Sequence, residues 1–194
     1  EHVLIPRQDT ETLVELVLSE HKEKNISLLD VCTGSGCIAI SLAKLGGYTD
    51  VTALDLSEEA LKVARSNGEK LLDQPVKFIK SDMFSALNPE KQYNVIVSNP
   101  PYIPSQVIEG LEPEVKDHEP RMALDGEPDG LKFYRILAEE GKKYLKNGGS
   151  IYMEIGWDQA KDVTEIFEAM GFSGLRTVRD MAGNDRVVCA RKEK

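Results

Sequence analysis

The sequence predicts an α/β fold, with a seven-stranded and mostly parallel sheet whose last strand is antiparallel. Apolar stretches of strand length alternate with helical stretches over most of the chain, which is typical of a parallel sheet covered on both faces. The last two strand-like stretches, 174–179 and 186–191, are separated by only about six residues, too few for a crossover helix, so the final strand is expected to run antiparallel. At 194 residues the chain has the length of one domain, expected to span 1–194.

The individual elements follow from local patterns. An apolar face at helical spacing predicts a helix over 12–22 with Asp9 or Thr10 as its N-cap, and Ser57 is suited to cap a helix over 57–71. A long polar loop is expected between residues 98 and 131. The remaining helices are predicted over 38–45, 131–145 and 158–170. Besides the two terminal strands, apolar runs predict strands over 27–31, 51–54, 76–79, 95–98 and 150–155.

Composition and charge argue against several classes of protein. The formal net charge is −9, from 24 basic and 33 acidic residues, which disfavours direct binding to nucleic acid. The three cysteines lack a C-x-x-C spacing and the three histidines are far apart in sequence, so neither a disulfide framework nor a metal site is indicated. No apolar stretch approaches the roughly 20 residues of a membrane span, and no secretory signal opens the chain. We therefore expect a soluble cytoplasmic protein, and the start at Glu1 suggests a fragment of a longer one.

A small-residue turn follows the predicted strand at 27–31 and precedes a helix. Gly34 and Gly36 let the backbone approach a ligand closely. The spacing also resembles the dinucleotide fingerprint, but Asp30 at the strand end would sit badly beside a pyrophosphate and well beside an ammonium group. The balance favours S-adenosylmethionine over NAD as the cofactor.

Two further acidic residues are expected at the ends of the next strands. Asp55 follows Gly36 by about 20 residues, the expected place for a carboxylate that accepts the ribose hydroxyls. Asp82 can accept from the adenine amine while the Met83 amide faces a ring nitrogen. The predicted cofactor-binding residues, all near the carboxyl ends of strands, are Asp30, Cys32, Thr33, Gly34, Ser35, Gly36, Asp55, Leu56, Asp82, Met83 and Asn99.

The tetrapeptide Asn99-Pro100-Pro101-Tyr102 directly follows the predicted strand at 95–98. The Asn99 side-chain oxygen and the Pro100 carbonyl can each accept one hydrogen from a planar –NH2 group, and Tyr102 could stack on the group that carries it. The same residues also fit a Pro-rich turn that only ends a strand. We expect Asn99 and Pro100 to be catalytic, and all four residues to bind substrate.

Taken together, these and other motifs resemble the HemK/PrmC family of protein-(glutamine) methyltransferases, which act on peptide chain release factors. The resemblance spans nearly the whole chain. It rests on 5–11, 30–36, Asp55, 81–84, 99–104, 117–126 and 182–186. Where the family commonly has Gly, this chain has Cys32, and Cys37 replaces a frequent Ala. We expect both to be small packed residues rather than catalytic thiols.

The resemblance implies a Rossmann-like methyltransferase fold and a reaction. That reaction is methylation of the glutamine amide nitrogen in the Gly-Gly-Gln motif of release factors, with S-adenosylhomocysteine as product. It further implies a helical N-terminal recognition domain, which we expect this fragment to lack. Separately, we expect a monomer, although the sequence alone leaves the oligomeric state open. The roles of Arg7, Glu11, Glu119 and Arg121 stay open between ordering loops, meeting the substrate and forming structural salt bridges.

Two alternatives remain at this point. A methyltransferase of the same Asn-Pro-Pro-Tyr type could act on a ribosomal-protein glutamine or on an exocyclic base amine of DNA or rRNA. A noncatalytic module could bind S-adenosylmethionine or NAD without transferring a methyl group.

Overall fold

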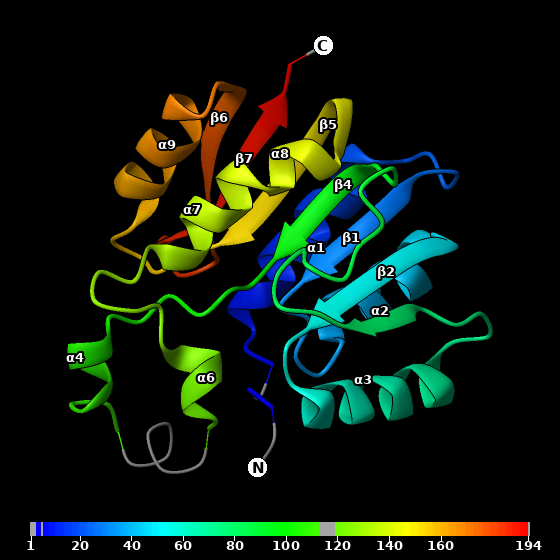
Figure 1. The fold of residues 1–194 in the computed structure, drawn as a ribbon, viewed down its shortest axis with the longest axis horizontal. Coiled ribbons are helices and arrows are strands. Elements are labelled where there is room, and N and C mark those ends of the chain that lie inside the picture. The colour runs from blue at the N-terminus through cyan, green and yellow to red at the C-terminus, as the bar shows by residue number, and fades with distance from the viewer. Residues whose placement is uncertain (1–2, 5, 113–118, 194) are drawn as a thin grey trace.

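The computed structural model describes residues 3–4, 6–112 and 119–193, and it contains one seven-stranded sheet with helices on both sides (Figure 1). The strand order is β3-β2-β1-β4-β5-β7-β6. Only β7 runs against its neighbours, pairing antiparallel with both β5 and β6. The predicted α/β class and the reversed last strand are therefore confirmed.

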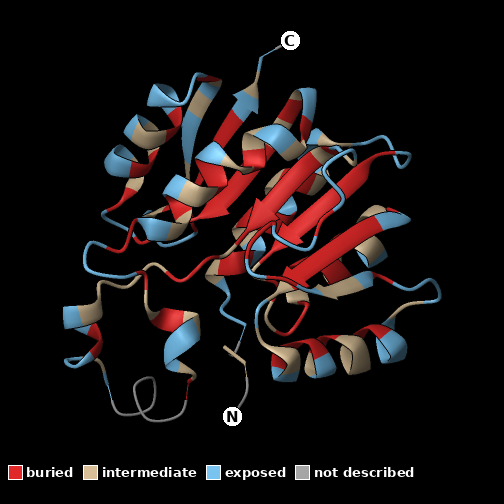
Figure 2. Ribbon diagram, viewed as in Figure 1, coloured by how far each residue is buried: buried red, intermediate tan, exposed pale blue. Residues whose placement is uncertain are grey.

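Apart from the start of β5, the strands begin and end close to the predicted bounds. They are β1 (Ser27–Val31), β2 (Asp50–Asp55), β3 (Lys77–Lys80), β4 (Tyr93–Ser98), β5 (Leu145–Glu154), β6 (Phe172–Arg179) and β7 (Asp185–Lys192). All five residues of β1 are buried, as expected for a central parallel strand with helices on both faces (Figure 2).

The helices cover both faces of the sheet. Helices α1 (Asp9–Glu20), α2 (Cys37–Gly46) and α3 (Glu58–Leu71) lie on one face. Helices α7 (Lys132–Glu139), α8 (Gly141–Tyr144) and α9 (Ala160–Ala169) lie on the other. Two single-turn helices, α4 (Ser105–Ile108) and α6 (Arg121–Leu124), lie within the predicted polar loop.

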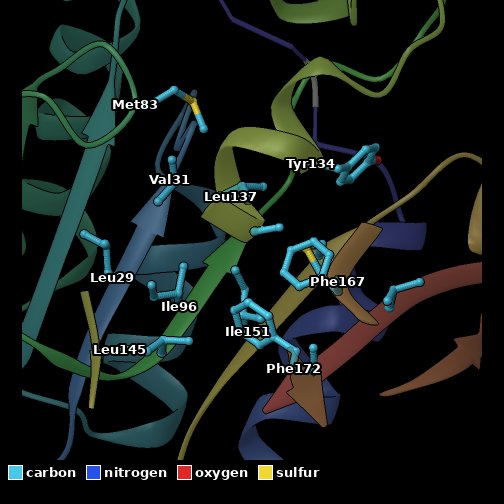
Figure 3. Packing of buried hydrophobic residues seen from close by; sticks show 14 of the residues in the cluster. Leu29, Val31, Met83, Ile96, Tyr134, Leu137, Leu145, Ile151, Phe167 and Phe172 are labelled. Atoms are coloured by element: carbon cyan, nitrogen blue, oxygen red, sulfur yellow. The ribbon is translucent and has the colours of Figure 1, made fainter. Parts of the chain in front are cut away.

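The hydrophobic core is split by the sheet into two clusters. Figure 3 shows the larger one, where Leu137 and Tyr134 of α7 and Phe167 of α9 pack over Ile96 and Ile151 of the central strands. The second cluster joins α1 and α2 to the opposite face of the same strands. Because apolar packing fixes the sheet from both sides, the loops at its carboxyl edge rest on a rigid base.

The helix predicted over 131–145 is confirmed over most of its length, but it is broken at Glu140. Helices α7 and α8 meet at Glu140, and the chain then enters β5 at Leu145 rather than at residue 150. Leu145 pairs with Tyr93, and the register shifts before Ser150. Gly149 permits this shift, because a Cβ there would lie 2.9 Å from the Lys146 carbonyl oxygen and 3.0 Å from that of Asn94.

The predicted N-cap of the first helix is wrong. Gln8 holds the cap position without a side-chain hydrogen bond. Asp9 instead pairs with Arg186 at 3.2 Å, and Thr10 donates its hydroxyl to Glu154 at 2.7 Å. Neither Asp9 nor Thr10 caps the helix, because each side chain is bound to a residue far away in the sequence. The predicted Ser57 cap of α3 is confirmed, since its hydroxyl accepts the Ala60 amide.

Candidate functional site

A pocket lies at the carboxyl edge of the sheet, where open α/β sheets bind ligands. It spans the point where the chain order reverses, since β1 lies between β2 and β4. We call it the strand-end pocket. The predicted site residues that line it are Cys32, Thr33, Gly34, Ser35, Asp55, Leu56, Asp82, Met83, Asn99 and Pro101. Asp30, Gly36, Pro100 and Tyr102 lie within two residues of these in sequence but are not part of the pocket lining.

The turn after β1 needs its two glycines for different reasons. Gly36 has a φ of 80° and starts α2, and a Cβ there would lie 3.0 Å from Ile40 and 3.1 Å from Ala64. Gly34 has a φ of 55°, but a Cβ there would meet nothing within 4 Å. The Asn67 side chain of α3 donates to the Ser35 carbonyl at 3.0 Å and holds the turn in place. The turn thus packs against α3 while leaving open space at Gly34.

Asp55 joins the end of β2 to this turn. One carboxylate oxygen accepts the Gly34 amide at 2.8 Å and the other accepts the Ser57 amide at 2.9 Å. Burial raises the pKa of Asp55, while these backbone hydrogen bonds oppose the shift. Each carboxylate oxygen has a second lone pair, so Asp55 can still accept hydrogen bonds from a ligand in the pocket.

Asp30 lies beneath the pocket and is 1 % exposed. Its Oδ2 accepts the Thr33 hydroxyl at 2.6 Å and the Ala39 amide at 3.2 Å. Its Oδ1 is buried and has no hydrogen-bond partner among the described residues. Burial raises the pKa of Asp30 to about 7. An orphaned carboxylate oxygen at this depth suits a cationic group, whose approach would favour the ionised form.

Two non-glycine residues in the pocket have left-handed backbones. Cys32 has a φ of 61° and Met83 a φ of 46°, and the Cys32 sulfur lies 3.9 Å from that of Met83. Such backbone conformations are sparsely populated for non-glycine residues and often mark ligand-binding turns. Burial raises the pKa of the Cys32 thiol far above its usual range, so this cysteine is a packed group and a poor nucleophile.

The Asn99–Tyr102 segment leaves β4 along a well-supported path. Ser98 donates its hydroxyl to the Val31 carbonyl at 2.7 Å, which ties the end of β4 to β1. Gln159 donates to the Tyr102 carbonyl at 3.0 Å. Added Cβ atoms at Gly126 and Gly130 would lie 2.8 and 2.4 Å from Tyr102 backbone atoms. Three separate segments therefore fix the backbone that presents Asn99.

Several site residues were not predicted from the sequence. Glu154 is buried at the end of β5 beside Asn99, and Thr10 and Phe133 join the pocket from distant parts of the chain. An acid that ends an apolar strand, as Glu154 does, was the available signal. Gln159 bridges the Tyr102 and Gly130 carbonyls, a role that no local pattern indicates.

The residues with open roles divide into two groups. Arg7 pairs with Glu119 at 2.6 Å, linking the chain before α1 to the segment at the pocket rim, and Glu119 Oε2 is buried without a hydrogen-bond partner among the described residues. Arg121 makes exposed ion pairs with Glu109 and Asp125. Glu11 is exposed on α1.

Within the described ranges, no helix is long and apolar enough to cross a membrane. Among those same residues, no three His, Cys, Asp or Glu side chains are grouped as metal ligands. The motif at 117–126 lies partly outside the described residues, since the description resumes at Glu119.

A model described as "Methyltransferase small domain" matches residues 8–110, more than half of the chain. A methyltransferase from Pyrococcus furiosus superposes with a TM-score of 0.69 over 93 % of this chain and 81 % of that one, at 22 % identity. At 22 % identity this similarity supports only the fold, which is that of a Rossmann-like methyltransferase.

Closer relatives share more of the sequence. A release factor glutamine methyltransferase of Thermodesulfovibrio yellowstonii is 44 % identical over 99 % of this chain, which spans 70 % of that protein. One from Fusobacterium nucleatum is 45 % identical over 99 % of this chain, which spans 54 % of it. A release factor-specific protein-(glutamine-N5) methyltransferase structure from Alicyclobacillus acidocaldarius superposes with a TM-score of 0.58 at 31 % identity, covering 98 % and 95 % of the two chains. The chain belongs to the release factor glutamine methyltransferase family.

Proposed function

We propose that this protein transfers a methyl group from S-adenosylmethionine to the side-chain amide nitrogen of the glutamine in the Gly-Gly-Gln motif of peptide chain release factors. The observation that carries the proposal is the position of Asn99. It lines the strand-end pocket directly after a buried strand, followed by two prolines, in a chain of the release factor glutamine methyltransferase family.

The residues present fit the cofactor. The buried Asp30 Oδ1 lacks a partner and suits the ammonium group, and the Asp55 carboxylate at the end of β2 suits the ribose hydroxyls. Gly34 leaves open space where a side chain would project. Asp82 and Met83 line the pocket at the end of β3, where the adenine would be held. When bound, S-adenosylmethionine supplies an electrophilic methyl group on a sulfonium.

The chain's own contribution is to position a weak nucleophile. Asn99 Oδ1 and the Pro100 carbonyl would each accept one hydrogen of the glutamine –NH2, turning its lone pair out of conjugation and toward the methyl group. Their partial negative charges would also stabilise the positive charge that develops on nitrogen. Tyr102, beside them on a backbone held by Gln159, would pack on the planar amide. No metal is required for this displacement.

We further place the activity in the cytoplasm and assign it to a monomer. The net charge of −9 supports a protein substrate over a nucleic acid, because a base methyltransferase would need a basic face for its substrate.

The test is a labelled-methyl assay on intact release factor, ribosomal proteins and DNA in parallel. We expect label on the release factor, lost when the Gly-Gly-Gln glutamine is replaced by alanine. Label on ribosomal protein or DNA alone would overturn the proposed substrate. Calorimetry with S-adenosylhomocysteine and NAD separates a methyltransferase from a dinucleotide-binding module, since we expect heat only with S-adenosylhomocysteine.

A further inference from the structure

Asn99 and Glu154 lie side by side at the ends of neighbouring parallel strands. Strands β4 and β5 run side by side (Figure 1). Ser98 of β4 pairs with Met153 of β5, so the residues that follow them, Asn99 and Glu154, are adjacent. These register positions bring the Asn99 side chain beside the Glu154 carboxyl group, and Asn99 lowers the pKa of that carboxyl, as a donor facing it does. Glu154 is 2 % exposed, so the contact is shielded from water. A buried hydrogen bond to an ionised group is among the stronger ones in proteins.

This contact gives the Asn99 amide a direction. An ionised carboxylate can only accept hydrogen bonds, whereas an amide has a donating end and an accepting end. The Asn99 –NH2 must therefore face Glu154, and its oxygen is left to face elsewhere. Without a fixed neighbour the amide could turn over and present its –NH2 to the pocket, where it would repel another –NH2 group.

Glu154 is itself held by two neighbouring elements. Thr10 of α1 donates its hydroxyl to Glu154 Oε2 at 2.7 Å. Tyr134 of α7 donates to the Glu154 backbone carbonyl at 2.9 Å. Both sides of the sheet thus contribute to its position, and Thr10 ties it to the chain segment that also lines the pocket.

The surroundings of Glu154 raise its pKa on balance, although several neighbours oppose the rise. Burial raises its pKa, and Asp9 acts in the same direction. Thr10, Arg186 and Asn99 oppose that rise. Arg186 is fixed in turn by Asp180 at 3.1 Å. The carboxylate that directs Asn99 is therefore supported by a buried cation.

We propose that Glu154 is a positioning residue that orients the Asn99 amide, with the –NH2 on Glu154 and the oxygen toward the substrate glutamine. The inference rests on the proposed function. It makes Thr10, on the first helix, a second residue that acts on Asn99 through Glu154.

The first test compares Glu154→Gln with the matched control Glu168→Gln, an exposed glutamate on α9. A glutamine at 154 can donate or accept, so it no longer dictates the direction of the Asn99 amide. We expect kcat on intact release factor to fall on the order of 10-fold to 100-fold. KM and S-adenosylhomocysteine affinity should stay within about twofold of wild type, with Tm recorded for each variant. An unchanged kcat, or parallel losses of kcat and cofactor affinity, would overturn the proposal.

A pH profile separates orientation from a general structural role. Protonated Glu154 can donate, so wild-type kcat should fall as pH drops through the Glu154 pKa, and Glu154→Gln should lack that limb. Thr10→Val removes a hydrogen bond that lowers this pKa, so its limb should move to higher pH, whereas Thr10→Ser should restore the wild-type profile. Because Asp30 is present in every variant, its titration should contribute equally to all the pH profiles. The test is therefore the difference in kcat profile between each variant and wild type. Identical profiles would contradict the inference.

A readout independent of activity keeps this inference separate from the proposed function. The Asn99 side-chain amide resonance, identified by its loss in Asn99→Ala, should shift with pH in wild type and not in Glu154→Gln. If this shift occurs but release factor is not methylated, the geometry stands and the proposed substrate fails. If release factor is methylated but neither the resonance nor kcat depends on Glu154, the orienting role fails.

Discussion

The Asp55 carboxylate accepts the Gly34 amide at 2.8 Å, which ties the end of β2 to the glycine turn after β1. Its second oxygen holds the Ser57 amide at the start of α3. One side chain therefore shapes the floor of the strand-end pocket and also faces into it. A ligand that reaches Asp55 also contacts the residue on which the turn depends.

Replacing Asp55 should weaken S-adenosylhomocysteine binding. We expect Asp55→Ala to cost about 1.5 to 3 kcal/mol of binding free energy, as for lost charge-assisted hydrogen bonds. Isothermal titration calorimetry measures this directly. The control is Asp50→Ala, at the exposed start of the same strand, which should bind like wild type. Equal affinities for the two variants would remove Asp55 from the cofactor site.

Replacing Asn99 should separate chemistry from cofactor binding. Asn99→Ala removes the side-chain acceptor proposed for the substrate amide, so methyl transfer should fall about 100-fold to 1000-fold. The affinity for S-adenosylhomocysteine should change little. Both quantities need to be measured on one preparation. A joint loss would mean that Asn99 serves the cofactor, and the substrate assignment would have to be abandoned.

Gly126 provides a test of the backbone that carries Tyr102. A Cβ at residue 126 would lie 2.8 Å from the Cα atoms of Tyr102 and Gly130, so Gly126→Ala must displace backbone. We expect a lower kcat with S-adenosylhomocysteine affinity retained. Gly110→Ala is the control, because its nearest contact would be an ordinary 3.6 Å from the Val107 carbonyl oxygen. A fully active Gly126→Ala would show that the position of Tyr102 is not critical.

The three cysteines should be unreactive in the folded protein. Burial raises the pKa of Cys37 to about 11 and of Cys189 to about 12, and that of Cys32 still further. Thiolate is the reactive form, so N-ethylmaleimide at neutral pH should modify the native protein slowly and leave methyl transfer intact. Urea-unfolded protein should react quickly at all three. Rapid labelling of Cys32 in the native state would contradict the structure.

Asp30 should make the stability of the ligand-free protein depend on pH. Its pKa rises from 3.8 to about 7 on folding, so the folded state binds the proton more tightly than the unfolded state. The resulting stabilisation is complete below about pH 4 and is lost progressively as pH rises to about 7, by on the order of 4 kcal/mol. Asp30→Asn should therefore lose less stability than wild type between pH 5 and pH 8 in urea unfolding. Asp73→Asn, at an exposed site, should behave like wild type.

Elements with strong local signals are predictable from this sequence. The strand at 27–31 is predicted to the residue because its apolar run is buried on both faces. Helix α3 is predicted because Ser57 caps it and acidic residues fill its first turn. The break between α7 and α8 at Glu140, in contrast, has no strong local signal in the sequence. Residues 131–145 have helical periodicity, but pairing of Leu145 with Tyr93 draws the end of that stretch into the sheet.

The same division applies to the candidate site. Asp55, Asp82 and Asn99 are predictable because each closely follows an apolar strand, and parallel strands bring their ends to one edge. Thr10 and Gln159 are not, because their roles depend on partners more than 50 residues away in the chain. Whether each predicted residue binds ligand remains a prediction for the variants described above.

The placement of β1 beside β4 has a consequence for how the protein folds. The hydrogen bond from Ser98 to Val31 joins residues 67 positions apart, and β2 and β3 lie between them in sequence. Contacts of such long sequence separation form late, since loop-closure entropy opposes them. We therefore expect the strand-end pocket to be incomplete during synthesis until Asn99 has left the ribosome. A cofactor analogue, for the same reason, should protect the whole domain against thermal unfolding rather than one loop.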